Sequence, residues 1–169
     1  MTRTYKVKKA FLIPFIITAA LLAVLLLISL FYGRPWENII LAVLCIVALL
    51  VAVEASEREF AVSEDSLGIR KFFRPKKFTW PEITHLGIVT LRNKAYFLLT
   101  TTRGFYIFSN LIENHERLLG DLAEKLGNEK VETEVTSYLE NPLQRTSLIV
   151  LSWVAAVIII AIIVMKLLA

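Results

Sequence analysis

The chain has 169 residues, 56% of them apolar, and a formal net charge of +4. Soluble domains have about 45–50% apolar residues, so part of this chain is expected to lie outside water. The single cysteine, Cys45, excludes an intrachain disulfide and a cysteine-based zinc site within one chain. The apolar excess lies in three blocks, and the segment between the second and third has an ordinary composition.

These three blocks are predicted to cross a membrane. The first runs from Ala10 to Tyr32 without a charge, which exceeds the ~20 residues that a helix needs to span a bilayer. The second, Asn38 to Val53, is shorter, and the third runs from Thr146 to Met165. The turn residues between the first two, 33–36, predict a helical hairpin.

The first block also has the basic start of a signal peptide. Its apolar stretch is too long for one, and no cleavage site of small residues follows it before Arg34. We therefore expect an uncleaved helix. The segment before it contains Arg3, Lys6, Lys8 and Lys9 without an acid. The positive-inside rule then predicts a cytoplasmic N-terminus and, after two crossings, a cytoplasmic soluble segment.

The soluble segment changes its hydrophobic period along its length. Residues 59 to 108 alternate with a period of two and contain short turns, which predicts an antiparallel meander of five or six strands. In this prediction residues 74–77 break the strand. Residues from Asn110 to Gly127 follow helical spacing, with Asn110 as the expected N-cap and Glu113 as its back-bonding acid.

This helix is the element expected to cover the apolar face of the meander. Residues 129–144 fit a helix by spacing and a strand by β-branched content, and they stay undecided. The sequence thus predicts an α+β membrane protein, with three transmembrane helices and a small antiparallel sheet or half-barrel capped by one helix. The expected divisions are a cytoplasmic N-terminus with the hairpin (1–54), a soluble domain (55–128), a connector (129–145) and a third span (146–169).

The soluble domain resembles bacterial pleckstrin-homology-like (PH-like) domains. The resemblance rests on the strand pairs, on Trp80-Pro81-Glu82-Ile83 in mid-meander, on the 110–127 helix and on two membrane helices ahead of the domain. It implies a multi-pass protein of the bacterial cytoplasmic membrane whose domain binds ligands at a basic hairpin. The third span and the lower strand count depart from the family pattern of seven strands.

A basic cluster with interleaved aromatic residues is the candidate binding site. It places five cations within eight residues and no acid, in a domain tied to the inner leaflet at both ends, where each cation near an anionic surface contributes about 1 kcal/mol. Its alternative interpretation is a solvated turn whose aromatic residues belong to the core. The candidate lipid-binding or partner-binding residues are Arg70, Lys71, Phe72, Phe73, Arg74, Lys76 and Lys77.

No residue set predicts catalysis, a cofactor or a metal site. His85 and His115 stand alone, whereas a metal site needs several convergent ligands. The basic cluster is too short to favour nucleic acid. Small residues spaced by four, such as Ser152 and Ala156, can bring membrane helices together or occur by chance.

Two functions fit, and neither is enzymatic. The first is a binding or scaffold module that contacts lipid headgroups or a protein at the cytoplasmic face. The second is an accessory subunit that stabilises or regulates a larger membrane complex. The expected partners are membrane lipids and an integral membrane protein or further copies of this chain.

Overall fold

The computed structural model describes residues 2–71, 74–92, 94–143 and 146–168. Its contacts divide the chain into two compact units. The membrane unit comprises Lys9–Ser56 and Thr146–Ala169, and the soluble unit comprises Met1–Lys8 and Glu57–Arg145. The soluble unit is therefore built from segments on both sides of the hairpin that the sequence predicts.

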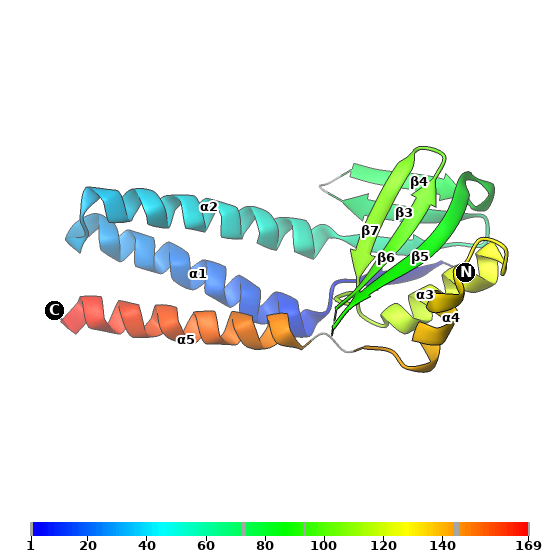
Figure 1. The fold of residues 1–169 in the computed structure, drawn as a ribbon. Coiled ribbons are helices and arrows are strands. Elements are labelled where there is room, and N and C mark those ends of the chain that lie inside the picture. Colours follow the sequence, from blue (N-terminus) through cyan, green and yellow to red (C-terminus); the bar gives the residue numbers. More distant parts are fainter. Residues whose placement is uncertain (1, 72–73, 93, 144–145, 169) are drawn as a thin grey trace. The chain divides into compact units, whose positions relative to one another are not determined.

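The membrane unit consists of three long apolar helices (Figure 1). They are α1 (Lys9–Tyr32), α2 (Pro35–Glu57) and α5 (Ser147–Leu168). Each is long and apolar enough to cross a membrane, which confirms the three predicted spans. The second span is longer than predicted and continues through Glu54 to Glu57.

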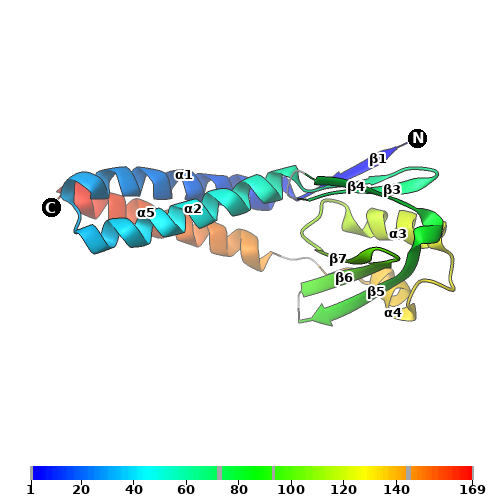
Figure 2. The ribbon, with the colours of Figure 1, turned by 90° about the horizontal axis from the view of Figure 1, so that it is seen from above.

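Helices α1 and α5 run side by side (Figure 2). The Thr18 hydroxyl on α1 lies 2.8 Å from the Pro14 carbonyl oxygen and 3.1 Å from that of Ser152 on α5. Ala19 and Ala156 are buried in the unit. Small side chains let two backbones approach closely in lipid, where no hydrophobic effect drives helices together.

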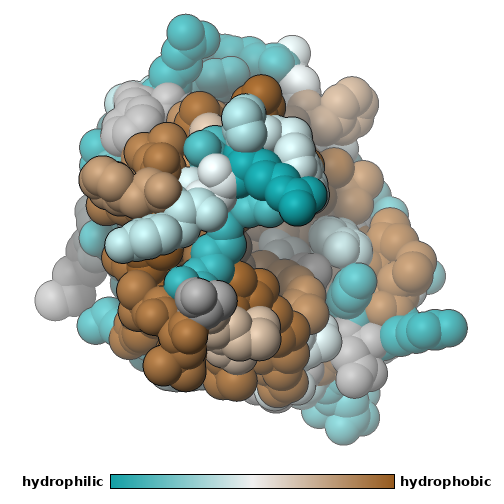
Figure 3. Space-filling view, turned by 90° about the vertical axis from the view of Figure 1, so that its left-hand side faces the viewer, coloured by the Kyte–Doolittle hydropathy of each residue, from teal (hydrophilic) through white to brown (hydrophobic). Residues whose placement is uncertain are grey.

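A polar cluster joins the helices at one end of the membrane unit. The Lys166 ammonium on α5 lies 2.8 Å from a carboxylate oxygen of Glu37 on α2 and donates to the Ser29 hydroxyl of α1 at 3.3 Å. In Figure 3, which faces the side where the α1–α2 turn and the C-terminus lie, hydrophilic surface lies between hydrophobic areas. The ion pair places the C-terminal end of α5 beside this turn.

The described residues of the soluble unit contain seven strands in two antiparallel sheets. The first sheet has the order β1-β2-β3-β4, and the second has the order β5-β6-β7. A short 3₁₀ turn, Trp80–Glu82, connects them. The strands are β1 (Arg3–Lys6), β2 (Glu59–Val62), β3 (Ser66–Lys71), β4 (Arg74–Thr79), β5 (Ile83–Leu91), β6 (Lys94–Thr101) and β7 (Gly104–Ser109).

The strand β1 was not predicted from the sequence. The N-terminal segment, expected to belong with the hairpin, pairs instead with β2, so that Tyr5 lies opposite Phe60. Arg3 and the Tyr5 hydroxyl both donate to Asp121 of the helix α3 (His115–Leu126), each at 2.6 Å. Burial, followed by the hydrogen bond to Asp121, raises the pKa of Tyr5 to about 12. β1 is thus held by a neighbouring strand and by a helix.

The predicted break at 74–77 is wrong, because these residues belong to β4. Pro75 pairs with Arg70 and Lys76 with Ile69. Strand β4 ends its sheet, so the missing N–H of Pro75 can face outward without interrupting the ladder. The basic residues therefore alternate between two faces of a strand instead of sharing one turn.

The helix predicted from Asn110 begins later, at His115. Backbone groups between Asn110 and His115 bond instead to the end of β1 and the residues after it. Lys8 N donates to the Leu111 carbonyl and Glu113 N donates to that of Lys6, both at 2.8 Å. The Asn110 side chain donates to the Leu143 carbonyl and does not cap the helix. Helix α3 spans His115–Leu126 and ends at Gly127, as predicted for its C-terminus.

A second helix, α4 (Thr133–Glu140), resolves the undecided segment and corrects the expectation of a single capping helix. Its Val135 and Tyr138 are buried in the same core as the leucines of α3. The Tyr138 hydroxyl lies 2.9 Å from His115 Nε2. Desolvation lowers the pKa of His115, so this buried imidazole is neutral at pH 7.

The core lies between the inner faces of the two sheets and the two short helices (Figure 1). It includes Leu67 of β3, Phe97 of β6 and Leu122 of α3, none of which has any exposed area. A Leu to Ala change in such a core costs about 2–5 kcal/mol.

Leu122→Ala is therefore expected to lower the free energy of unfolding of the soluble unit by about 2–5 kcal/mol. Proteolysis of the full chain in mild detergent across a urea gradient measures it. Lys125→Ala, at an exposed position of the same helix, should stay within about 0.5 kcal/mol of the wild type. Equal urea midpoints for the two variants would contradict the burial of Leu122.

Candidate basic ligand-binding site

The two-residue period of β4 divides the predicted basic cluster. Lys76 lies opposite Ile69 of the core, whereas Lys77 lies opposite Gly68, on the other face of the sheet. Lys71, Arg74 and Lys76 line one pocket, and Arg70 and Lys77 do not. Phe72 and Phe73, which were predicted to take part, lie outside the described residues.

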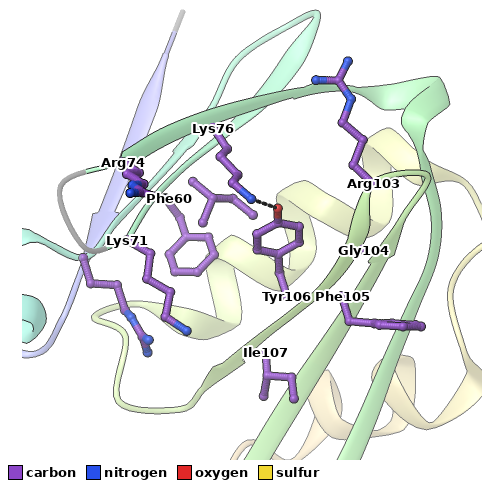
Figure 4. A pocket seen from close by; sticks show the side chains of 11 residues that line it. Phe60, Lys71, Arg74, Lys76, Arg103, Gly104, Phe105, Tyr106 and Ile107 are labelled. Atoms are coloured by element: carbon purple, nitrogen blue, oxygen red, sulfur yellow. Dashed lines mark hydrogen bonds between the residues drawn. The ribbon is translucent and has the colours of Figure 1, made fainter.

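The pocket lies between β4 and β7, the terminal strands of the two sheets, and has a volume of about 600 Å³ (Figure 4). Part of its lining was not predicted from the sequence: Arg58 ahead of β2, Arg103 in the β6–β7 turn and Tyr106 of β7. These residues are far from the basic cluster in the sequence. Only the closure of the two sheets brings them together, and no local pattern marks them.

Lys76 bridges the two sides of the pocket. Its ammonium donates to the Tyr106 hydroxyl at 2.9 Å and lies 5.4 Å from the centre of that ring. A cation so close to the hydroxyl and so far from the ring centre lies near the ring plane, so the contact is a hydrogen bond more than a cation–π interaction. The Tyr106 ring also packs against Phe78, with centroids 5.0 Å apart. Figure 4 shows Lys76 pointing toward Tyr106, while Arg103 points away from it.

The pocket carries an excess of positive charge. Five of its lining residues are Lys or Arg, and no carboxylate lines it in the part of the chain that the structure describes: Arg58, Lys71, Arg74, Lys76 and Arg103. Arg103 is paired with Glu82, at 2.6 Å. Cations gathered around a pocket without a carboxylate favour an anionic ligand.

The two remaining basic residues lie on the outer face of the first sheet. Arg70 is paired with Glu57 at 2.8 Å, and both Arg70 and Lys77 line a shallow groove of about 470 Å³. Glu59 also lines this groove. Lys76 lines this groove as well, but Glu59 shares it, so the outer groove carries a smaller excess of positive charge than the inner pocket.

The register of the first sheet places one end of the pocket, at Lys71 and Arg74, close to the chain's exits from the soluble unit. Lys6 pairs with Glu59, Glu59 with Arg70, and Arg70 with Pro75, so these residues form one row across the sheet. Lys6 lies three residues before α1, and Glu59 lies two residues after α2. Lys71 and Arg74 form the next pair beyond this row. They are the last described pair of the β3–β4 hairpin and lie at the same end of the sheet.

The histidines have local partners. His85 Nε2 lies 2.8 Å from Glu132, whose other oxygen accepts from Ile88 N at 3.1 Å. These hydrogen bonds, that of His85 first, hold the pKa of Glu132 below its ordinary range. Within residues 2–71, 74–92, 94–143 and 146–168, no three His, Cys, Asp or Glu side chains are grouped as metal ligands.

Comparison of the chain with protein-family models, curated proteins and solved structures finds no match.

Glu82 sets the orientation of Arg103 and carries a pH-dependent contribution to stability. It accepts from Thr79 N at 2.8 Å and from the Thr79 hydroxyl at 3.0 Å. These two hydrogen bonds, followed by the Arg103 charge, hold the pKa of Glu82 below its ordinary range. A lowered folded-state pKa contributes stability above the unfolded pKa, about 4.3 for Glu. That stability is lost as the pH falls through the folded-state value.

The stability of wild type should therefore decrease as the pH falls from 6 to about 3. The stability of Glu82→Gln should decrease less over the same range, because its uncharged amide does not titrate. Urea midpoints of the full chain in detergent at several pH values measure the difference. Glu140→Gln, at an exposed position of α4, serves as the matched control. The same pH dependence in Glu82→Gln and wild type would contradict this role of Glu82.

Proposed function

We propose that this protein is a non-enzymatic binding module, anchored in the membrane, whose basic pocket binds anionic lipid headgroups. We also propose that the soluble unit is a PH-like half-barrel. Two sheets of four and three strands followed by α3 support this, because the family pattern has seven strands before its helix. In this chain the membrane hairpin α1–α2 interrupts the pattern between its first and second strands.

The observation that carries the lipid proposal is the row Lys6–Glu59–Arg70–Pro75 across the first sheet. Two residues separate β1 from α1 and one separates α2 from β2, and a chain extends at most about 3.5 Å per residue. Arg58, which lines the pocket, directly follows the last residue of α2. These short links support the proposal that this end of the basic pocket reaches the headgroups.

The ligand chemistry is that of a phosphate-bearing, negatively charged headgroup. Ammonium and guanidinium groups donate charge-assisted hydrogen bonds to phosphate oxygens. The cytoplasmic leaflet is the anionic surface that basic segments meet, at about 1 kcal/mol per cation. With the basic N-terminal segment, this supports a soluble unit on the cytoplasmic side of the membrane. The resemblance to PH-like domains supports a bacterial inner membrane.

Replacing both Lys71 and Lys76 by Gln is expected to abolish stabilisation of the full chain by anionic lipid. A ligand at about 100 times its Kd stabilises the folded state by ~2.7 kcal/mol. Wild type in mild detergent should gain thermal stability from short-chain phosphatidylglycerol and much less from phosphatidylcholine. The gain should fall as salt rises, because exposed charges are screened.

Lys77→Gln is the control for this experiment, since it removes one lysine charge from β4 on the outer face instead of the inner face. It should keep the response to phosphatidylglycerol. An unchanged response in the Lys71/Lys76 variant would overturn the lipid proposal. If that variant instead loses a stoichiometric membrane protein that co-purifies with wild type, the accessory-subunit function replaces it.

The proposed orientation is tested by labelling in intact cells. In a Cys45→Ala background, Arg34→Cys in the α1–α2 turn should react with a membrane-impermeant thiol reagent, and Asn128→Cys should not. Both positions are exposed in their own units, so burial cannot explain the difference. Labelling of position 128 in intact cells would overturn the cytoplasmic placement.

A further inference from the structure

The second sheet lacks negative charge altogether. From Ile83 to Ile112 the sequence contains no Asp or Glu, and its Lys and Arg residues are Arg92, Lys94 and Arg103. Arg92 and Lys94 flank the turn of the β5–β6 hairpin. A tip that is basic and free of acid is suited to an anionic surface.

The same tip exposes apolar side chains. Leu91 is 62% exposed and Val89 is 48% exposed, and they share one face of β5 because they are two residues apart. Leu91 pairs with Lys94, the last pair of the hairpin, so an aliphatic and a cationic side chain emerge from the same face. Large exposed aliphatic residues flanked by cations are typical of segments that lie in the membrane interface.

Hydrogen bonds within the soluble unit place this tip near the exits of the chain. The Ala95 carbonyl, one residue from Lys94, accepts from Asn110 N at 3.2 Å. The Asn110 side chain donates to the carbonyl of Leu143, four residues before α5. Its neighbour Leu111 accepts from Lys8 N, directly before α1, at 2.8 Å. The β5–β6 tip, Lys8 at the exit toward α1 and Leu143 on the approach to α5 therefore share one end of the soluble unit.

We infer that this tip enters the interfacial layer of the bilayer, with Val89 and Leu91 among the upper acyl chains and Arg92 and Lys94 at the phosphates. Lys and Arg can hold their charge at headgroup level while an aliphatic neighbour lies deeper. This inference rests on the proposed function and adds a second contact to the basic pocket. The backbone of Arg92 supports it, because Arg92 holds φ at 53°, where glycine or asparagine is the ordinary turn residue.

The test uses the full chain with Cys45→Ala, a spin label at Leu91→Cys and nanodiscs of phosphatidylcholine and phosphatidylglycerol. Power saturation compares the access of oxygen, which concentrates in the bilayer, with that of a water-soluble nickel chelate. The label at position 91 should be more accessible to oxygen than to the nickel chelate. Arg92→Gly, which suits a positive φ and so keeps the turn, should shift the label toward nickel.

Thr102→Cys is the control. Thr102 is exposed and does not line the basic pocket, and it lies in the β6–β7 turn, at the other end of the same sheet. Its label should meet nickel more than oxygen. Equal access of the nickel chelate at both positions would overturn the inference, and so would equal access of oxygen at both. A label at position 91 that is shielded from both reagents would indicate a protein contact and would also overturn it.

The inference and the proposed function fail separately. If the label at 91 is water-exposed while replacement of Lys71 and Lys76 still abolishes the response to phosphatidylglycerol, headgroup binding stands and tip insertion is wrong. If the lysine replacements leave that response unchanged, the proposed function is wrong whatever the label reports. Proteolysis in urea confirms that each labelled variant remains folded.

Discussion

The pairing of β1 with β2 is the constraint on which the rest of the structure depends. These strands are neighbours in the sheet, although two membrane helices separate them in the sequence. Adjacent strands lie about 4.8 Å apart, so the chain must leave for α1 and return from α2 at one end of the sheet. The bonds from Arg3 and Tyr5 to Asp121 extend this constraint to α3. An insertion at any other loop would place other residues at the exits toward the membrane.

The division into sheets of four and three strands leaves β4 and β7 as edges. Edge strands commonly carry Pro and Lys, which hinder pairing with other chains, and this explains Pro75 and Lys77 without a ligand. It does not explain Lys76, which faces the Tyr106 hydroxyl across the pocket, nor the arginines that join it from other elements. The inner cations are therefore the ones that call for a function. Along β4, the two-residue period places Lys76 on the inner face and Lys77 on the outer face.

The membrane unit is held by few polar contacts. In lipid, helices associate through close packing and hydrogen bonds, and the small residues between α1 and α5 allow both. The pair of Glu37 and Lys166 joins α2 to α5 at the end where the α1–α2 turn lies. This pair gives the Lys166 ammonium a carboxylate partner within the membrane unit.

The sequence by itself determined the elements whose signal is local. Long uncharged apolar runs predict the three spans, and a two-residue period over residues 59–108 predicts β2, β3 and β5–β7. Leucine spacing with Gly127 predicts the body and the end of α3. Only the tertiary structure decided the rest. A four-residue strand such as β1 has too short a pattern to be recognised apart from its partner. The start of α3 depends on backbone groups that bond to the end of β1 and the residues after it.

The basic pocket depends on Arg58, Lys76 and Arg103, which come together only because two sheets close around a shared core. Period and composition report on near neighbours along the chain, whereas a binding site is made by neighbours in space.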